Sequence, residues 1–180
     1  MSRGRLSRRR RPTAIGLCLL LAARAALADV TAQDLQIAAR ALSFLQKPPS
    51  GDVAMGIVYV PGNPQSRAEA ESLQRMLNEG LKVGNITLKS TLISLDEVPR
   101  ASVGLFFLTT GLGAGAQTLA DISHAKHLPC LTTDLSQVAA GRCAVGVRSK
   151  PKIEIVVNRV AAAASGATFS TVFRMMITEL

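Results

Sequence analysis

The chain has 180 residues, of which 48% are hydrophobic, and a formal net charge of +9. This charge does not describe a basic folded surface, because residues 1–28 hold seven arginines and no acid, which leaves 14 basic and 12 acidic residues, a net charge of +2. With five Phe, one Tyr and no Trp, the chain lacks both a basic face for nucleic acid and an aromatic platform for single strands.

Residues 1–28 have the pattern of a secretory signal peptide. An arginine-rich start is followed by a short apolar segment at 14–23 and by Ala-Leu-Ala at 26–28, a small-x-small cleavage site. The apolar segment is about half as long as a membrane span requires. We therefore expect cleavage before Asp29, a periplasmic location, and a mature chain (29–180) that forms one domain.

Hydrophobic periodicity and turn signals predict the elements of the mature chain. They are, in order, helix 31–46, strand 52–60, helix 66–79, strand 86–92, a turn at 96–101, strand 103–108, helix 117–126, strand 129–133, helix 135–140, strands 143–147 and 153–157, and helices 158–164 and 168–177. Thr31 and Asp34 suit the start of the first helix, and Ser66 with Glu69 matches a capping box for the second.

This alternation predicts an α/β fold. We expect a single-domain three-layer sandwich with a mostly parallel sheet. The last two predicted strands lie close together in sequence, so they should form an antiparallel C-terminal hairpin at the edge of the sheet.

The stretch 103–134 organises the chain as a strand, a glycine-rich turn, a helix and a second strand. In parallel α/β sheets, ligands bind outside the carboxyl ends of the strands. The residues at those ends are therefore candidates for a ligand or partner loop. They are Thr109, Thr110, Gly111, Gly113, Gln117, Thr132, Thr133 and Asp134.

The glycines of this turn allow three interpretations. Residues 111–116 match G-x-G-x-x-A, and Asp134 follows at the distance of a ribose-binding acid, so the pattern fits a dinucleotide site. Nicotinamide cofactors are scarce outside the cytoplasm, however, and no second domain remains to hold a substrate. The other interpretations are a tight strand-to-helix turn, or a loop that holds a small polar or anionic ligand.

Cys130 and Cys143 are the only cysteines of the mature chain, and an even pair in an oxidising compartment predicts a disulfide. Two buried free thiols are the alternative. With His124 and His127 the cysteines have a spacing unlike that of paired zinc knuckles, so we expect no metal. No nucleophile motif is present, and we expect neither an enzyme nor a cofactor.

The order of elements resembles that of the YfiR/HmsC family of small periplasmic regulatory proteins. The similarity lies in residues 38–48, 57–60, 105–108, 128–134, 141–142 and 152–158. It implies a compact α/β domain that binds the periplasmic domain of an inner-membrane diguanylate cyclase or sensor and restrains it, which lowers cyclic di-GMP. It also implies a role for redox state in that regulation.

Three functions therefore stay open. The first is this non-enzymatic regulator, whose partner would dock near the terminal helices, with a homodimer as a further possibility. The second is a single-lobed periplasmic solute-binding protein that uses the turn at 109–117. The third is a dinucleotide-binding enzyme.

Overall fold

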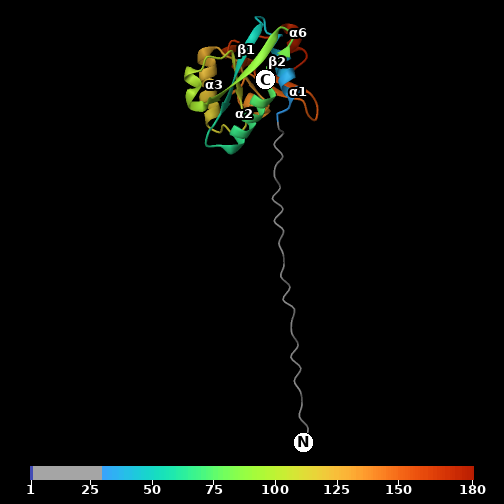
Figure 1. Cartoon of the computed structure of the whole chain (residues 1–180). Helices are drawn as coiled ribbons and strands as arrows, with labels where there is room; N and C mark the ends of the chain where they lie inside the picture. The colour runs from blue at the N-terminus through green and yellow to red at the C-terminus, as the bar shows by residue number, and fades with distance from the viewer. Residues whose placement is uncertain (2–29) are drawn as a thin grey trace.

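The structure is a computed structural model that describes Met1 and residues 30–180. The predicted signal peptide and its cleavage site lie outside the described residues. Figure 1 shows a layered domain in which α1 and α3 lie on opposite sides of a central sheet.

The helices and strands alternate along the chain, as the sequence predicts. Their bounds are α1 Ala32–Leu42, β1 Gly51–Tyr59, α2 Pro64–Met76, β2 Leu81–Val83, β3 Ile86–Ser94, the 3₁₀ helix η1 Leu95–Arg100, β4 Leu105–Leu108, α3 Gly115–Lys126, β5 Cys130–Thr132, α4 Leu135–Ala139, β6 Val145–Arg148, β7 Glu154–Val157, α5 Arg159–Ala164, α6 Thr171–Arg174 and β8 Thr178–Glu179.

The eight strands form one sheet in the order β2-β3-β1-β4-β5-β6-β7-β8. The five strands from β3 to β6 are parallel, β2 is antiparallel to β3, and β7 is antiparallel to β6. The predicted α/β class, the mostly parallel sheet and the C-terminal hairpin are therefore confirmed. Two strands were not predicted from the sequence: β2, and the two-residue β8, which pairs in parallel with β7, so that β8 and not the hairpin forms this edge of the sheet.

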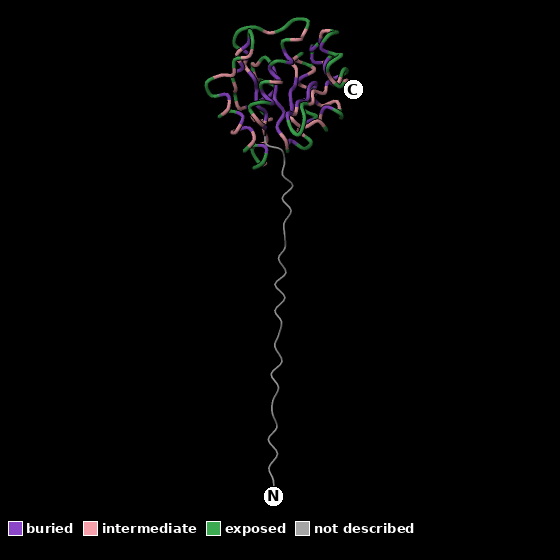
Figure 2. Tube along the Cα trace, turned by 90° about the vertical axis from the view of Figure 1, so that its right-hand side faces the viewer, coloured by how far each residue is buried: buried purple, intermediate pink, exposed green. Residues whose placement is uncertain are grey.

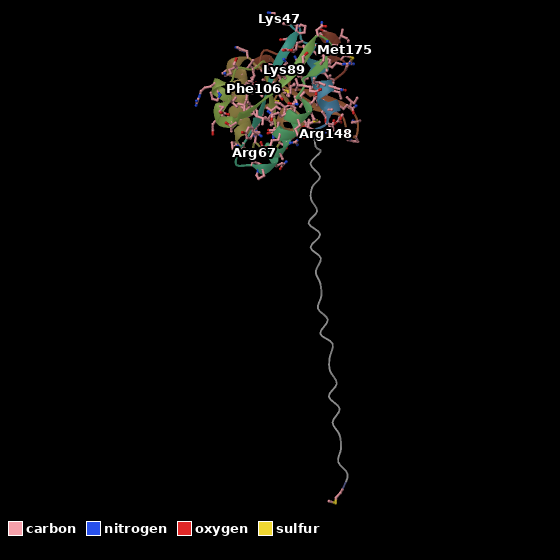
Figure 3. All side chains as sticks on the ribbon, in the orientation of Figure 1. Lys47, Arg67, Lys89, Phe106, Arg148 and Met175 are labelled. Carbon is pink, nitrogen blue, oxygen red and sulfur yellow. A yellow bond between two sulfur atoms is a disulfide. The ribbon has the colours of Figure 1, made fainter. Side chains whose placement is uncertain are left out.

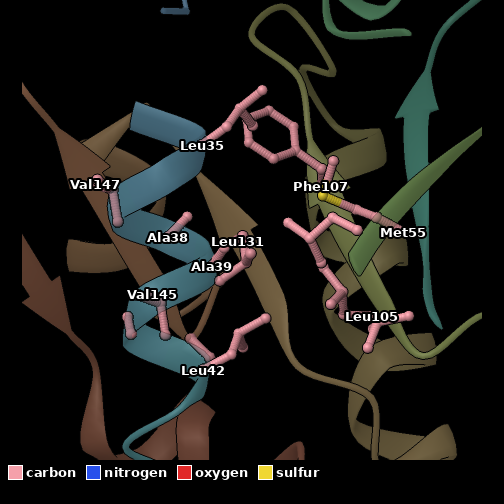
Figure 4. Close-up of a cluster of buried hydrophobic side chains, with 14 of the residues drawn as sticks. Leu35, Ala38, Ala39, Leu42, Met55, Leu105, Phe107, Leu131, Val145 and Val147 are labelled. Atoms are coloured by element: carbon pink, nitrogen blue, oxygen red, sulfur yellow. The ribbon is translucent and has the colours of Figure 1, made fainter. Parts of the chain in front are cut away.

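The sheet buries a separate apolar cluster on each face. On one face, α1, α2 and the C-terminal segment cover side chains such as Met55, Leu105 and Phe107 (Figure 4). On the other face, α3, α4 and η1 cover Phe106 and Leu108. Alternate residues of β4 thus serve opposite clusters, which explains why this strand is apolar throughout. Figure 2 shows the buried residues concentrated inside the domain.

The two long N-terminal helices begin differently. Thr31 caps α1, as predicted, and its hydroxyl and amide also form a capping box with Asp34. The predicted Ser66–Glu69 box is wrong. Asn63 caps α2 instead and accepts hydrogen bonds from the amides of Gln65 and Ser66, because Pro64 suits the first helical turn.

The C-terminal segment is less helical than predicted. The backbone of 168–170 pairs with the chain after α1: Gln46 donates to the carbonyl of Thr168, and Ser170 donates to that of Phe44. The last helix therefore covers only Thr171–Arg174. Phe173 stacks on Phe44 with the ring centroids 4.7 Å apart, which fixes this segment against α1.

Cys130 and Cys143 form a disulfide, and both residues are buried. The bond joins the first residue of β5 to the loop before β6, at the amino edge of the sheet. Within the described residues, no helix is both long and apolar enough to cross a membrane.

Candidate functional site

A pocket lined by polar residues lies at the carboxyl edge of the sheet. It is near the point where successive strands switch from being added on one side of β1 to being added on the other. From β1 the chain moves to β3 on one side, whereas from β4 it moves to β5 and β6 on the other side. Such a switch point leaves a crevice between the loops that follow β1 and β4, which is where open α/β sheets bind ligands.

The pocket has a volume of about 490 Å³, within the range of small-molecule sites. Its wall is built from α1, α2 and the ends of β4, β5 and β6. The lining residues are Thr31, Asp34, Gln65, Thr110, Gly111, Thr133, Asp134, Arg148, Ser149 and Lys150. Figure 3 shows Arg148 and Arg67 at the end of the domain opposite Lys47, which precedes β1.

Four of the eight predicted loop residues line this pocket. They are Thr110, Gly111, Thr133 and Asp134. The contributions of α1 and of the turn after β6 were not predicted from the sequence. Ser149 and Lys150 follow the predicted strand 143–147, so the rule that ligands bind at the carboxyl ends of strands could have identified them.

Thr109 and Thr132 are buried and connect neighbouring strands. Thr109 donates to the carbonyl of Val58 on β1 at 2.7 Å, and its hydroxyl is also 2.8 Å from that of Ser66 on α2. Thr132 donates to the carbonyl of Leu108 at 3.0 Å. These hydroxyls hold the strand ends in register, which positions the loops that form the pocket.

Thr110 is held by α2 across the switch point. Its amide donates to the Glu69 carboxylate at 2.7 Å, its hydroxyl donates to the same oxygen, and Gln65 donates to the hydroxyl at 3.2 Å. One wall of the pocket is thus fixed by side chains of the helix that follows β1.

The glycine-rich turn is explained by backbone conformation and close packing. Gly111 and Gly113 have positive φ angles of 81° and 56°. A Cβ atom on Gly111 would lie 2.8 Å from the side-chain nitrogen Nδ2 of Asn63, and one on Gly115 would overlap with the side chain of Leu95. Gln117 does not line the pocket, and its side chain donates to Asp121.

Asp134 caps the next helix. Its carboxylate accepts hydrogen bonds from the amide and hydroxyl of Ser136 and from Gln137. A ribose-binding acid needs a carboxylate that is available to the ligand, so this geometry offers no support to the dinucleotide hypothesis.

Asp34 connects α1 to the turn after β6. It accepts hydrogen bonds from the amide and hydroxyl of Thr31 and, at 2.6 Å, from the amide of Ser149. Burial raises the pKa of Asp34, but the hydrogen bonds from Thr31 and Ser149 outweigh burial and hold the pKa below its usual value. The carboxylate is therefore ionised at neutral pH.

Larger hollows lie elsewhere on the described part of the chain, and the three considered next are not at the carboxyl ends of the five parallel strands β3 to β6. One, between α1, β2 and the C-terminal segment, is lined by Ile37, Phe44, Phe173 and Met176 among others. A second hollow is lined by residues that include the ion pair of Arg174 and Glu179. A third lies beside the end of α2. Within the described residues, no three His, Cys, Asp or Glu side chains lie together in a way that could hold a metal ion.

No protein-family model matches the chain, and no curated protein matches its sequence. Solved structures do match its fold. A Streptococcus pneumonia ABC domain in complex with L-Trp matches with a TM-score of 0.57 and 11% identity, over 81% of this chain and 61% of that one. A ligand-free, open substrate-binding protein with adhesive properties from Clostridium difficile has a TM-score of 0.57 and 10% identity, over 84% and 60%.

A conserved domain protein from Vibrio cholerae matches with a TM-score of 0.56 and 14% identity, over 82% of this chain and 58% of that one. The chain thus spans about 60% of the length of these three proteins. At these identities the likeness establishes a shared fold.

Proposed function

We propose that this protein is a non-enzymatic, single-lobed binding protein that holds a small polar solute in the carboxyl-edge pocket. The observation that carries the proposal is the convergence of the ends of β4, β5 and β6 on one polar pocket beside the switch point. Two structures of the same fold support it, since one is described as a complex with L-Trp and another as a substrate-binding protein.

The proposed compartment is the periplasm. The signal-peptide pattern of residues 1–28 supports export, and the Cys130–Cys143 disulfide suits an oxidising compartment. Sequencing the N-terminus of the protein recovered from the periplasm tests this, because export with the expected cleavage leaves Asp29 as the first residue.

Thr133 offers the cleanest variant for testing solute binding. It lines the pocket after β5, whereas Thr110 is bound to Glu69 and Gln65, so that changing Thr110 would alter α2 as well. Thr133→Trp should obstruct the pocket, because a large side chain replaces a small one in its wall. Thr118→Trp, at an exposed position of α3, is the matched control.

The experiment is a thermal-shift screen of the purified protein against small polar solutes. We expect at least one solute to raise the melting temperature of the wild type and of Thr118→Trp but not of Thr133→Trp. A solute that stabilises all three proteins equally would place binding elsewhere.

A second candidate is the regulator of an inner-membrane diguanylate cyclase or sensor. The observation that favours it is a group of exposed apolar side chains at the C-terminal end, Val172, Met175 and Met176, beside the hollow formed with α1. Exposed apolar groups of this kind occur at protein-binding surfaces.

This candidate is tested by cellular cyclic di-GMP. Deletion of the gene should raise it, the wild-type protein should restore it, and a Met175→Ser/Met176→Ser variant should not. Restoration by that variant but not by Thr133→Trp would instead connect regulation to the pocket.

A further inference from the structure

The four charged side chains of the pocket wall differ in how their charges are compensated. The two carboxylates, Asp34 and Asp134, accept hydrogen bonds from groups inside the domain: Thr31 and Ser149 for the first, Ser136 and Gln137 for the second. Their negative charges are thus used to cap helices and to fix a turn.

The two cations of the wall, Arg148 and Lys150, form no ion pair within the described residues. The nearest acidic candidate for Arg148 by register is Glu154, its partner in the β6–β7 pairing. Glu154 instead forms an ion pair with Lys152 at 3.2 Å. Arg148 is partly exposed, Lys150 is exposed, and both residues line the pocket.

The turn that carries the two cations is fixed by Asp34. Ser149 stands between Arg148 and Lys150, and its amide is bound by the Asp34 carboxylate at 2.6 Å. A backbone anchored between two cationic residues reduces the conformational freedom that is lost when they close on a ligand.

We propose that the pocket recognises an oxyanion, a carboxylate or a phosphoryl group of the solute, through Arg148 and Lys150. This inference rests on the proposed solute-binding function and names its ligand class. Arg148 supplies a planar fork of N–H donors and Lys150 a compact ammonium, both of which suit either oxyanion. The hydroxyl of Thr133 lies in the same pocket as a further donor.

The test is isothermal titration calorimetry of the purified protein with succinate, with inorganic phosphate and with uncharged glucose. The variants are Arg148→Gln and Lys150→Gln. The matched controls are Arg75→Gln, on the last turn of α2, and Lys47→Gln, at the other end of the domain. Melting temperatures of all variants check that each is folded, and titrations at raised salt give a second measurement that needs no variant.

We expect succinate or phosphate to bind the wild type and both controls. Each pocket variant should weaken binding about tenfold or more, as is usual when a charge-assisted hydrogen bond is lost. Raised salt should weaken anion binding to the wild type. Comparison of the two anions distinguishes a carboxylate from a phosphoryl ligand.

Either of two results would overturn the inference. One is that neither anion binds, and the other is that the pocket variants bind them as tightly as the wild type. If glucose or another uncharged solute binds and Thr133→Trp abolishes that binding, the solute-binding function stands and only the oxyanion assignment fails.

Discussion

The carboxylate of Asp34 accepts a hydrogen bond of 2.6 Å from the amide of Ser149, 115 residues later in the chain. The same carboxylate caps α1 through Thr31, so one buried acid joins the first helix of the described domain to the turn after β6. Replacing this acid therefore affects both the fold and the pocket.

Asp34→Asn should lower the free energy of unfolding by about 1–3 kcal/mol, the range for weakening hydrogen bonds to a buried charged group. Urea denaturation followed by circular dichroism measures the change. Asp121→Asn is the control, because Asp121 is exposed on α3 and accepts one hydrogen bond from Gln117. Equal stability of Asp34→Asn and wild type would contradict the proposed role of this contact.

The pH dependence of stability follows from the lowered pKa of Asp34. A carboxylate whose pKa is lower in the folded than in the unfolded state stabilises the fold fully above its unfolded pKa of about 3.9. That contribution is lost as the pH falls through the folded pKa. The stability difference between wild type and Asp34→Asn should therefore shrink below about pH 4, and a constant difference down to acid pH would contradict this assignment.

The buried hydroxyl pair of Ser66 and Thr109 connects α2 to the ends of β1 and β4. Thr109→Val keeps the shape but leaves the carbonyl of Val58 and the Ser66 hydroxyl without this partner, and it should cost about 1–3 kcal/mol. Thr118→Val, at an exposed site, should change stability little. A double-mutant cycle with Ser66→Ala measures the coupling, which should be non-zero because the two side chains touch.

The element types could be predicted from sequence because apolar periodicity follows burial. The fully apolar strand 105–108 is an example, since alternate side chains enter the two clusters. The start of α2 and the end of the chain could not be predicted in this way. Ser66 fits a capping box locally, but its hydroxyl bonds to Thr109, and residues 168–170 pair with the chain after α1, which no local pattern records.

Only part of the pocket lining could be predicted from the sequence. Residues after β4 and β5 could be identified, since strand ends in a parallel sheet share an edge. The contributions of Asp34 and Arg148 depend on where α1 packs and on how the turn after β6 is held. Both depend on tertiary contacts, which no local sequence pattern predicts.

Gly111 should resist substitution more than Gly62, which also lies in a loop. Its φ is 81°, and a Cβ atom would lie 2.8 Å from the side-chain nitrogen Nδ2 of Asn63, which donates a hydrogen bond to the Gly111 carbonyl. Gly111→Ala should destabilise the fold by about 1–2 kcal/mol, the cost of a left-handed conformation for an L-residue. Gly62→Ala, where a Cβ would meet nothing within 4 Å, is the control in the same thermal denaturation.

The disulfide should stabilise the fold by about 3 kcal/mol, because it closes a loop between residues 13 apart. Cys130→Ala/Cys143→Ala should show this loss in urea denaturation. Reduction of the wild type before unfolding should give a loss of similar size, whereas the double variant should not respond to reductant.

The measurement that tests solute binding most directly is an amide NMR titration of the ¹⁵N-labelled protein with the solute that gives the largest thermal shift. Solute binding in the carboxyl-edge pocket predicts that the perturbed amides cluster at Thr110, Gly111, Thr133, Asp134 and Ser149. Perturbations confined to α5 and α6, or spread evenly over the surface, would contradict the proposed site.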